Sequence, residues 1–278
     1  MSSSTRFRKY ARKTPGLDIL YRWILQKTLI PFEPVTDETE PPPGRFSQLL
    51  FAHEGREVHK WLHYCEIYDE LFDPFVSRPR PADRPIRFLE IGVLHGGSLE
   101  VWLKYFGENA TVFGIDIDPA CAVNPPEGAA VRTGSQADSK FLESVIIEMG
   151  GVDIILDDGC HISSIQRKTF DILFPLLNEG GLYVVEDTST SYAWSFGGGF
   201  RRPGTVIQMA KGMVDGMHKS YFRTRVGRRG MLAWREVGNI RFFESIISIQ
   251  KKRRVQPQSG AFGTTNLLRM RSLTPEAD

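Results

Sequence analysis

The feature that most constrains the fold is a glycine-rich turn within residues 88–98, which read Phe-Leu-Glu-Ile-Gly-Val-Leu-His-Gly-Gly-Ser. The apolar residues that lead into it predict a buried strand with the carboxylate of Glu90 near its tip. Gly92 lets the backbone approach a ligand where a Cβ would clash. Ser98 stands where a hydroxyl can cap the helix that follows. By itself such a turn is more often structural than ligand-binding, so a second signal is needed.

That second signal is Asp116, which ends another predicted strand at residues 111–117. A carboxylate at the tip of the second strand, roughly 20 residues past a glycine turn, suits hydrogen bonding to the two hydroxyls of a ribose. The turn lacks the Gly-x-Gly-x-x-Gly spacing of dinucleotide-binding proteins. Glu90 would also repel a pyrophosphate, whereas it would attract an ammonium group. The two signals together predict an adenosine-type ligand, and they favour S-adenosylmethionine.

Composition excludes few classes of protein. The chain has 278 residues, of which 41% are hydrophobic, so it can form one large domain or one domain with an extension. A net charge of +2 gives no strong electrostatic case for nucleic acid as a partner. No apolar run approaches the ~20 residues of a membrane span. The three cysteines have neither a pairing pattern nor a metal-binding spacing, which favours a reducing, cytoplasmic location.

Two segments are strongly basic. Residues 1–13 contain five lysines and arginines and no acid, and residues 251–254 read Lys-Lys-Arg-Arg. Solvated chain segments are the favoured interpretation, and peripheral contact of the N-terminus with an anionic membrane surface is the alternative. A homo-oligomer is compatible with the sequence.

Pro-rich stretches divide the chain into four predicted parts. Residues 1–45 contain an amphipathic helix at 16–31 and a linker, and residues 46–85 form a helical cap followed by a second linker. The core occupies residues 86–255, and residues 256–278 form a tail.

Extended and helical patterns alternate through the core. Strands are predicted at 86–91, 111–117, 130–132, 152–156 and 182–185, and helices at 98–106, 138–149, 162–177 and 205–217. Such alternation is typical of a parallel sheet covered on both faces. Residues 237–241 and 242–251 are extended with no helix between them, which predicts an antiparallel hairpin. The predicted fold class is therefore α/β, with a doubly wound, mostly parallel, seven-stranded Rossmann-like sheet and an N-terminal helical extension.

Pairs of acids end two of the predicted strands. The first pair is Asp157-Asp158, with His161 three residues later, and the second is Glu186-Asp187. Ligand sites gather at the carboxyl ends of strands in such sheets, so the two pairs are expected to meet. Adjacent carboxylates favour a hard divalent ion such as Mg²⁺, and His161 could act beside it as a general base. The alternatives are that Asp157 binds loop amides and that His161 is structural.

From about residue 59 to residue 251 the chain resembles a family of class I S-adenosylmethionine-dependent methyltransferases. The best-understood relatives are Mg²⁺-dependent sugar O-methyltransferases of macrolide biosynthesis, and some members are labelled cephalosporin hydroxylases. The resemblance is carried by residues 60–68, 89–98, 114–118, 134–136, 157–161, 186–192 and 242–245.

The resemblance implies a role for each candidate site residue. S-adenosylmethionine would be bound by residues that follow or end the first four predicted strands. Its methionine end would lie at Glu90, Gly92 and Ser98, with Asp157 nearby. Its ribose would lie at Asp116, and its adenine at Ser135 and Gln136. Mg²⁺ would be held by Asp158, Glu186 and Asp187. His161 would take a proton from a sugar hydroxyl of a glycosylated natural product, a glycolipid or a polysaccharide.

The chain departs from the family pattern at three positions. Ser135 stands where Asp is frequent, Ser189 where His is usual, and Cys160 where Gly or Ser is frequent. The Gly-rich loop at 187–204 is expected to act as a substrate lid or, alternatively, to be a solvated surface loop. Two other functions stay open, namely an NAD-dependent sugar oxidoreductase and a non-catalytic protein that binds S-adenosylmethionine or a partner.

Overall fold

The computed structural model of the protein describes residue 36 and residues 39–78, 81, 84–218, 236–255, 257–260 and 262–263. The basic segment 1–13 and the predicted amphipathic helix 16–31 lie outside the described residues. In the part that is described, no helix is both long and apolar enough to cross a membrane.

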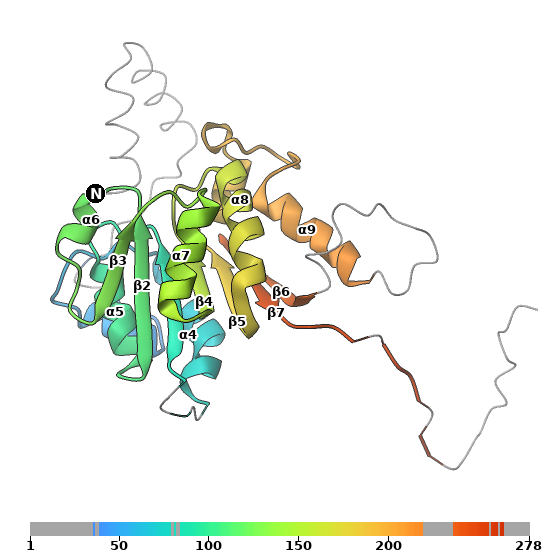
Figure 1. Cartoon of the computed structure of the whole chain (residues 1–278), viewed down its shortest axis with the longest axis horizontal. Helices are drawn as coiled ribbons and strands as arrows, with labels where there is room; N and C mark the ends of the chain where they lie inside the picture. The colour runs from blue at the N-terminus through green and yellow to red at the C-terminus, as the bar shows by residue number, and fades with distance from the viewer. Residues whose placement is uncertain are drawn as a thin grey trace, which may run out of the picture.

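In the described part of the chain, seven strands form one central sheet in the order β3-β2-β1-β4-β5-β7-β6 (Figure 1). The strands are β1 Ile86–Ile91, β2 Ala110–Asp116, β3 Ala129–Thr133, β4 Val152–Asp157, β5 Leu177–Val185, β6 Val237–Phe243 and β7 Ile246–Lys251. The first five strands are parallel to one another, whereas β7 is antiparallel to β5 and to β6. The predicted fold class is confirmed, including the antiparallel hairpin at the edge.

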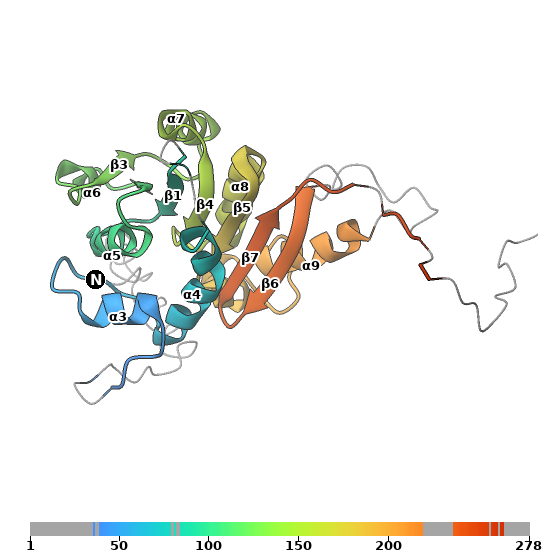
Figure 2. The same cartoon turned by 90° about the horizontal axis from the view of Figure 1, so that it is seen from below.

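Helices cover both faces of the sheet (Figure 2). They are α3 Arg45–Phe51, α4 Leu62–Val76, α5 Gly97–Phe106, α6 Ala120–Val123, α7 Ser139–Met149, α8 Ser163–Leu173 and α9 Val206–Met217. One hydrophobic cluster joins the sheet to α7, α8 and α9, and a second joins the opposite face to α3, α4 and α5. The sheet is therefore buried on both sides, as near-continuous apolar strands require.

The two-residue period of the strands decides which face each polar side chain joins. On β1, Phe88 packs in the cluster of α4 and α5, and Leu89 packs in the opposite cluster. Glu90 is two residues after Phe88, so its side chain lies on the same face of the sheet and faces α5. On β4, Leu156 also faces α4 and α5, so Asp157 faces α8. The two buried acids at these adjacent strand tips therefore lie on opposite faces of the sheet.

Several predicted boundaries were wrong. Gly96, with a φ of +82°, caps α5, so Ser98 lies inside the first turn of that helix. The predicted helix 162–177 ends at Leu173, and a 3₁₀ turn that contains Pro175 leads into β5. The hairpin turn lies at 244–245, later than predicted, with Ser245 in the left-handed region. Within the predicted helical cap of residues 46–85, α3 ends at Phe51 and α4 begins at Leu62.

Candidate active site

Glu90 is a fully buried carboxylate at the carboxyl end of β1. The Ser98 hydroxyl donates to its Oε2 at 2.6 Å, and the Trp102 indole nitrogen donates to its Oε1 at 3.3 Å. Burial raises the pKa of Glu90, and the nearby ammonium of Lys60 opposes this. The structure thus brings two predicted cofactor residues, Glu90 and Ser98, into direct contact.

Gly92 joins the glycine turn to the first acidic pair. Its φ is +93°, and a Cβ built on it would lie 2.3 Å from the carbonyl oxygen of Asp158. Its amide donates to the carbonyl of Ile115 at 2.8 Å, and the Asp158 amide donates to the carbonyl of Ile91 at 3.0 Å. The strand tips of β1 and β4 therefore pack backbone against backbone, and only glycine fits between them.

Asp116 lies at the carboxyl end of β2 and is 3% exposed. Its carboxylate accepts from the Leu94 amide at 3.1 Å and from the Asp118 amide at 2.9 Å. Leu94 itself has a φ of +51°. Asp116 therefore holds the glycine turn in shape at the position where a ribose is expected.

Three side chains form a compact cluster at the ends of β4 and β5. The His161 Nε2 lies 3.8 Å from Asp158 Oδ1 and 3.7 Å from Asp187 Oδ2. One ligand atom from each residue lies within 4.8 Å of the other two. His161 has a φ of +58° and is 5% exposed, and its buried Nδ1 has no hydrogen-bond partner among the described residues. The two carboxylates offer the oxygen ligands that an ion such as Mg²⁺ prefers, and the imidazole lies beside them.

Glu186 lies next to this cluster and contacts a side chain that sequence reasoning did not assign to the site. The Lys60 ammonium donates to both Glu186 carboxylate oxygens at 2.9 Å and to Asp158 Oδ2 at 2.8 Å. It also lies 3.7 Å from Glu90 Oε1, and the Lys60 side chain is 3% exposed. Burial lowers the pKa of Lys60, but the charges of the three carboxylates outweigh this and raise it well above its ordinary value.

Helix α4 supplies two more donors to the acids. The Tyr68 hydroxyl donates to Glu186 Oε1, and the Tyr64 hydroxyl donates to Asp187 Oδ1 at 2.8 Å. Tyr64 and Tyr68 are four residues apart in α4, a spacing that places helical side chains on one face, whereas Lys60 precedes the helix. The spacing predicts that the two tyrosines share a face but does not predict that they reach the acids.

Asp157 points away from the acidic cluster into a buried network. It accepts from the Tyr183 hydroxyl at 2.9 Å and from the Gln136 side-chain amide at 3.2 Å. Gln136 also accepts from the Cys160 amide at 2.9 Å, so it ties the loop after β3 to the loop after β4. Burial raises the pKa of Asp157 to about 6. The Ser135 hydroxyl accepts from the amide of Ala137 within its own turn.

The loop after β5 lies beside the acidic cluster. It contains 3₁₀ turns at Thr188–Tyr192 and Trp194–Phe196, and the Phe196 ring lies 6.4 Å from the His161 ring. Tyr192, Trp194 and Phe200 are exposed on this loop. The Ser245 hydroxyl donates to Ser189 Oγ at 2.9 Å, so the β6–β7 turn holds the loop at its start.

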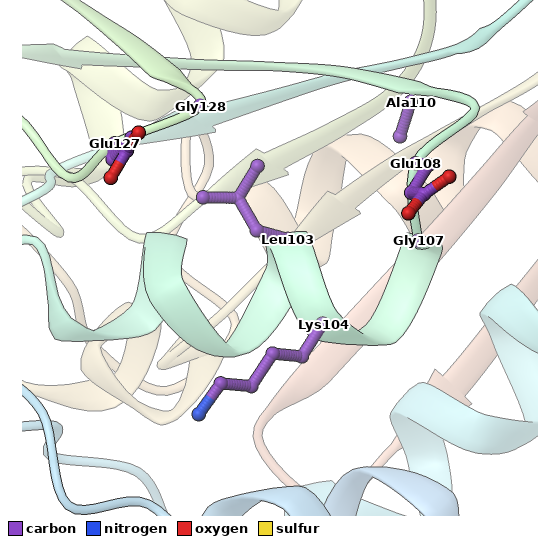
Figure 3. A pocket seen from close by; sticks show the side chains of 7 residues that line it. All are labelled: Leu103, Lys104, Gly107, Glu108, Ala110, Glu127 and Gly128. Carbon is purple, nitrogen blue, oxygen red and sulfur yellow. The ribbon is translucent and has the colours of Figure 1, made fainter.

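A cavity of about 560 Å³ lies away from this cluster. It opens between the end of α5 and the start of β2, and is lined by Leu103, Lys104, Gly107, Glu108, Ala110, Glu127 and Gly128 (Figure 3). Ala110 begins the strand that ends at Asp116, so the cavity lies at the amino ends of the strands. No predicted site residue lines it.

Comparison with known proteins gives several relatives of one kind. The chain is 34% identical over 237 residues to the 8-demethyl-8-alpha-L-rhamnosyl tetracenomycin-C 2'-O-methyltransferase of Streptomyces olivaceus, covering 77% of this chain and 61% of that protein. It is 39% identical over 148 residues to the L-olivosyl-oleandolide 3-O-methyltransferase of Streptomyces antibioticus, covering 49% of this chain and 38% of that protein. The chain thus spans less than two thirds of the length of these relatives. No family model matches it.

A solved structure agrees with these relatives. The MycE methyltransferase from the mycinamycin biosynthetic pathway, in complex with Mg and SAH, aligns with a TM-score of 0.65 at 27% identity, over 77% of this chain and 56% of that one. The resemblance drawn from the sequence motifs is confirmed. The chain has the class I S-adenosylmethionine-dependent methyltransferase fold and is related in sequence to the sugar O-methyltransferases of macrolide and tetracenomycin pathways.

Proposed function

We propose that the chain is an S-adenosylmethionine-dependent, metal-assisted O-methyltransferase that acts on a sugar hydroxyl. The observation that carries this proposal is the packing of the glycine turn against the acidic cluster. Gly92 lies against the Asp158 backbone, and Lys60 contacts both Glu90 and Asp158. A methyl donor bound at the turn would therefore lie next to the cluster that contains His161.

The cofactor residues divide according to the chemistry of the ligand. Glu90 presents a buried negative charge to the amino group of the methionine moiety, and Ser98 orients that carboxylate. Asp116 lies where a carboxylate can accept from ribose hydroxyls. Ser135 and Gln136 follow β3 and are proposed to lie at the adenine. Through Gln136, Asp157 stabilises the loop that carries Asp158 and His161.

Methyl transfer is an in-line displacement at the sulfonium carbon, so the acceptor oxygen must be aligned and deprotonated. His161 Nε2 lies 3.8 Å from Asp158 Oδ1 and 3.7 Å from Asp187 Oδ2, and we propose that it takes the proton of the acceptor hydroxyl. Asp158, Glu186 and Asp187 are proposed to hold Mg²⁺. When bound, the ion would supply Lewis acidity that lowers the pKa of a sugar hydroxyl.

The acceptor is proposed to be a glycosylated small molecule, a glycolipid or a polysaccharide with vicinal hydroxyls. Relatives are named for rhamnosyl and olivosyl compounds, and a further MycE complex contains mycinamycin VI. Tyr192, Trp194 and Phe200 expose aromatic surface on the loop beside His161, as an acceptor with an apolar aglycone would require. A cytoplasmic location, a homo-oligomer and membrane contact through the N-terminus stay predictions.

The test is a methyl-transfer assay with labelled S-adenosylmethionine against rhamnosyl glycosides and extracts of host glycolipids. Label is expected in a sugar-containing product, transfer is expected to stop with EDTA, and Mg²⁺ is expected to restore it. Calorimetry with S-adenosylhomocysteine and with NAD provides an independent readout of the cofactor. Binding of NAD alone, or full transfer in EDTA, would contradict the proposal.

A further inference from the structure

Lys60 occupies a position that joins the two halves of the proposed site. It directly precedes Trp61, the N-cap of α4, and its ammonium lies among carboxylates from three adjacent strand ends. These are Glu90, the penultimate residue of β1, Asp158 after β4 and Glu186 after β5. Each of them is buried or half-buried, so solvent screens their mutual repulsion poorly.

The segment that carries Lys60 is fixed at its other end. The Arg56 guanidinium pairs with Glu100 at 3.0 Å, and the Arg56 amide donates to the same carboxylate at 3.0 Å. A Cβ on Gly97 would lie 2.3 Å from the Arg56 carbonyl oxygen, so the segment lies directly against the start of α5. Lys60 is therefore placed between a segment that packs against α5 and the start of α4.

The balance of charge around Lys60 indicates how it affects the carboxylates. Glu90, Asp158, Glu186 and Asp187 carry four negative charges when ionised, and Lys60 supplies one positive charge in contact with three of them. Without a divalent ion, Lys60 offsets the repulsion between Asp158 and Glu186. With an ion present, the same ammonium repels it and competes with it for carboxylate oxygens.

We propose that Lys60 is a positioning residue that acts as the internal cation of the acidic cluster, holding Asp158 and Glu186 together and weakening the binding of a divalent ion there. This inference rests on the proposed function only in taking the cluster to be a metal site. The weaker binding of the ion would come from Lys60 itself, so the ion would exchange readily with solvent.

The test compares the wild-type protein with Lys60→Met, which removes the charge and retains most of the side-chain volume. Lys104→Met, at an exposed position on α5, is the matched control. Mn²⁺ binding is followed by electron paramagnetic resonance as loss of the free-ion signal, and thermal unfolding is followed with EDTA and with Mn²⁺.

Removal of a unit charge in contact with the ligands is expected to tighten Mn²⁺ binding by ~10-fold or more. Lys60→Met is also expected to have a lower Tm than wild type in EDTA and a larger rise in Tm with Mn²⁺. Lys104→Met is expected to match wild type in both measurements. If Lys60→Met does not fold, Lys60→Gln removes the same charge and retains a donor to Glu186.

Unchanged or weaker Mn²⁺ binding by the Lys60 variant would overturn the proposal, as would the absence of Mn²⁺ binding by both proteins. A purely structural lysine would produce weaker binding, so tighter binding separates the two roles. Calorimetry with S-adenosylhomocysteine on the wild type distinguishes a failure here from a failure of the methyltransferase proposal. If the protein binds S-adenosylhomocysteine but no Mn²⁺, the proposed cofactor site is supported and the proposed role of Lys60 is refuted.

Discussion

Replacement of Gly92 by alanine tests whether the glycine turn and the acidic cluster form one unit. The left-handed φ costs an L-residue about 1–2 kcal/mol, and the reduced entropy of the unfolded chain returns about 0.4–1 kcal/mol. At Gly92 the new Cβ would also meet the Asp158 carbonyl oxygen at 2.3 Å, and displacement of packed backbone costs a further ~1–3 kcal/mol. The expected loss in the free energy of unfolding is about 3 kcal/mol.

Gly150 provides the matched control, because its φ is +72° and the nearest described atom to a Cβ there, Arg87 Nε, would be 3.6 Å away. Gly150→Ala is expected to cost only about 1 kcal/mol in urea unfolding. Calorimetry should then show S-adenosylhomocysteine binding weakened ~10-fold or more in Gly92→Ala and unchanged in Gly150→Ala. Equal stability of the two variants, with wild-type binding by both, would refute the claim that the β1 and β4 tips are packed too closely for a Cβ.

Two further predictions concern the ionisable groups. His161→Ala should lower turnover ~10²–10⁴-fold while S-adenosylhomocysteine still binds, whereas His218→Ala, at the exposed end of α9, should have wild-type kinetics. Near wild-type turnover by His161→Ala would exclude it as the base. Because burial raises the pKa of Asp157 to about 6, the folded state binds more protons than the unfolded state between pH ~4 and 6, and stability falls as pH rises through that window. Asp157→Asn, unfolded in urea with EDTA, should remove about 3 kcal/mol of this dependence, and an unchanged slope would contradict the assignment.

The sheet was predictable because each of its parallel strands has an apolar run and each is followed by a turn or a helix. The acidic pairs were predictable for the same reason, since the carboxyl ends of parallel strands meet at one edge. The start of β5 was missed because Asn178 and Glu179 interrupt the apolar pattern, and the strand is held there by pairing of Leu177 with Val152 across a register shift. Such pairing depends on a neighbouring strand and leaves no local signal.

The contacts of α4 with the acids could not be read from the sequence for a related reason. Tyr64 and Tyr68 fit the apolar face of an amphipathic helix, and their rings do pack there, but their hydroxyls reach acids more than 110 residues away. Carboxylates that gather at buried strand ends must be met by donors or cations, because leaving them unpaired costs several kcal/mol each. An acidic cluster at these strand ends therefore needs a cation and hydroxyl donors from a facing element, although this need does not say which residues supply them. Lys60, just before α4, supplies the cation, and Tyr64 and Tyr68 on one face of α4 supply the hydroxyls.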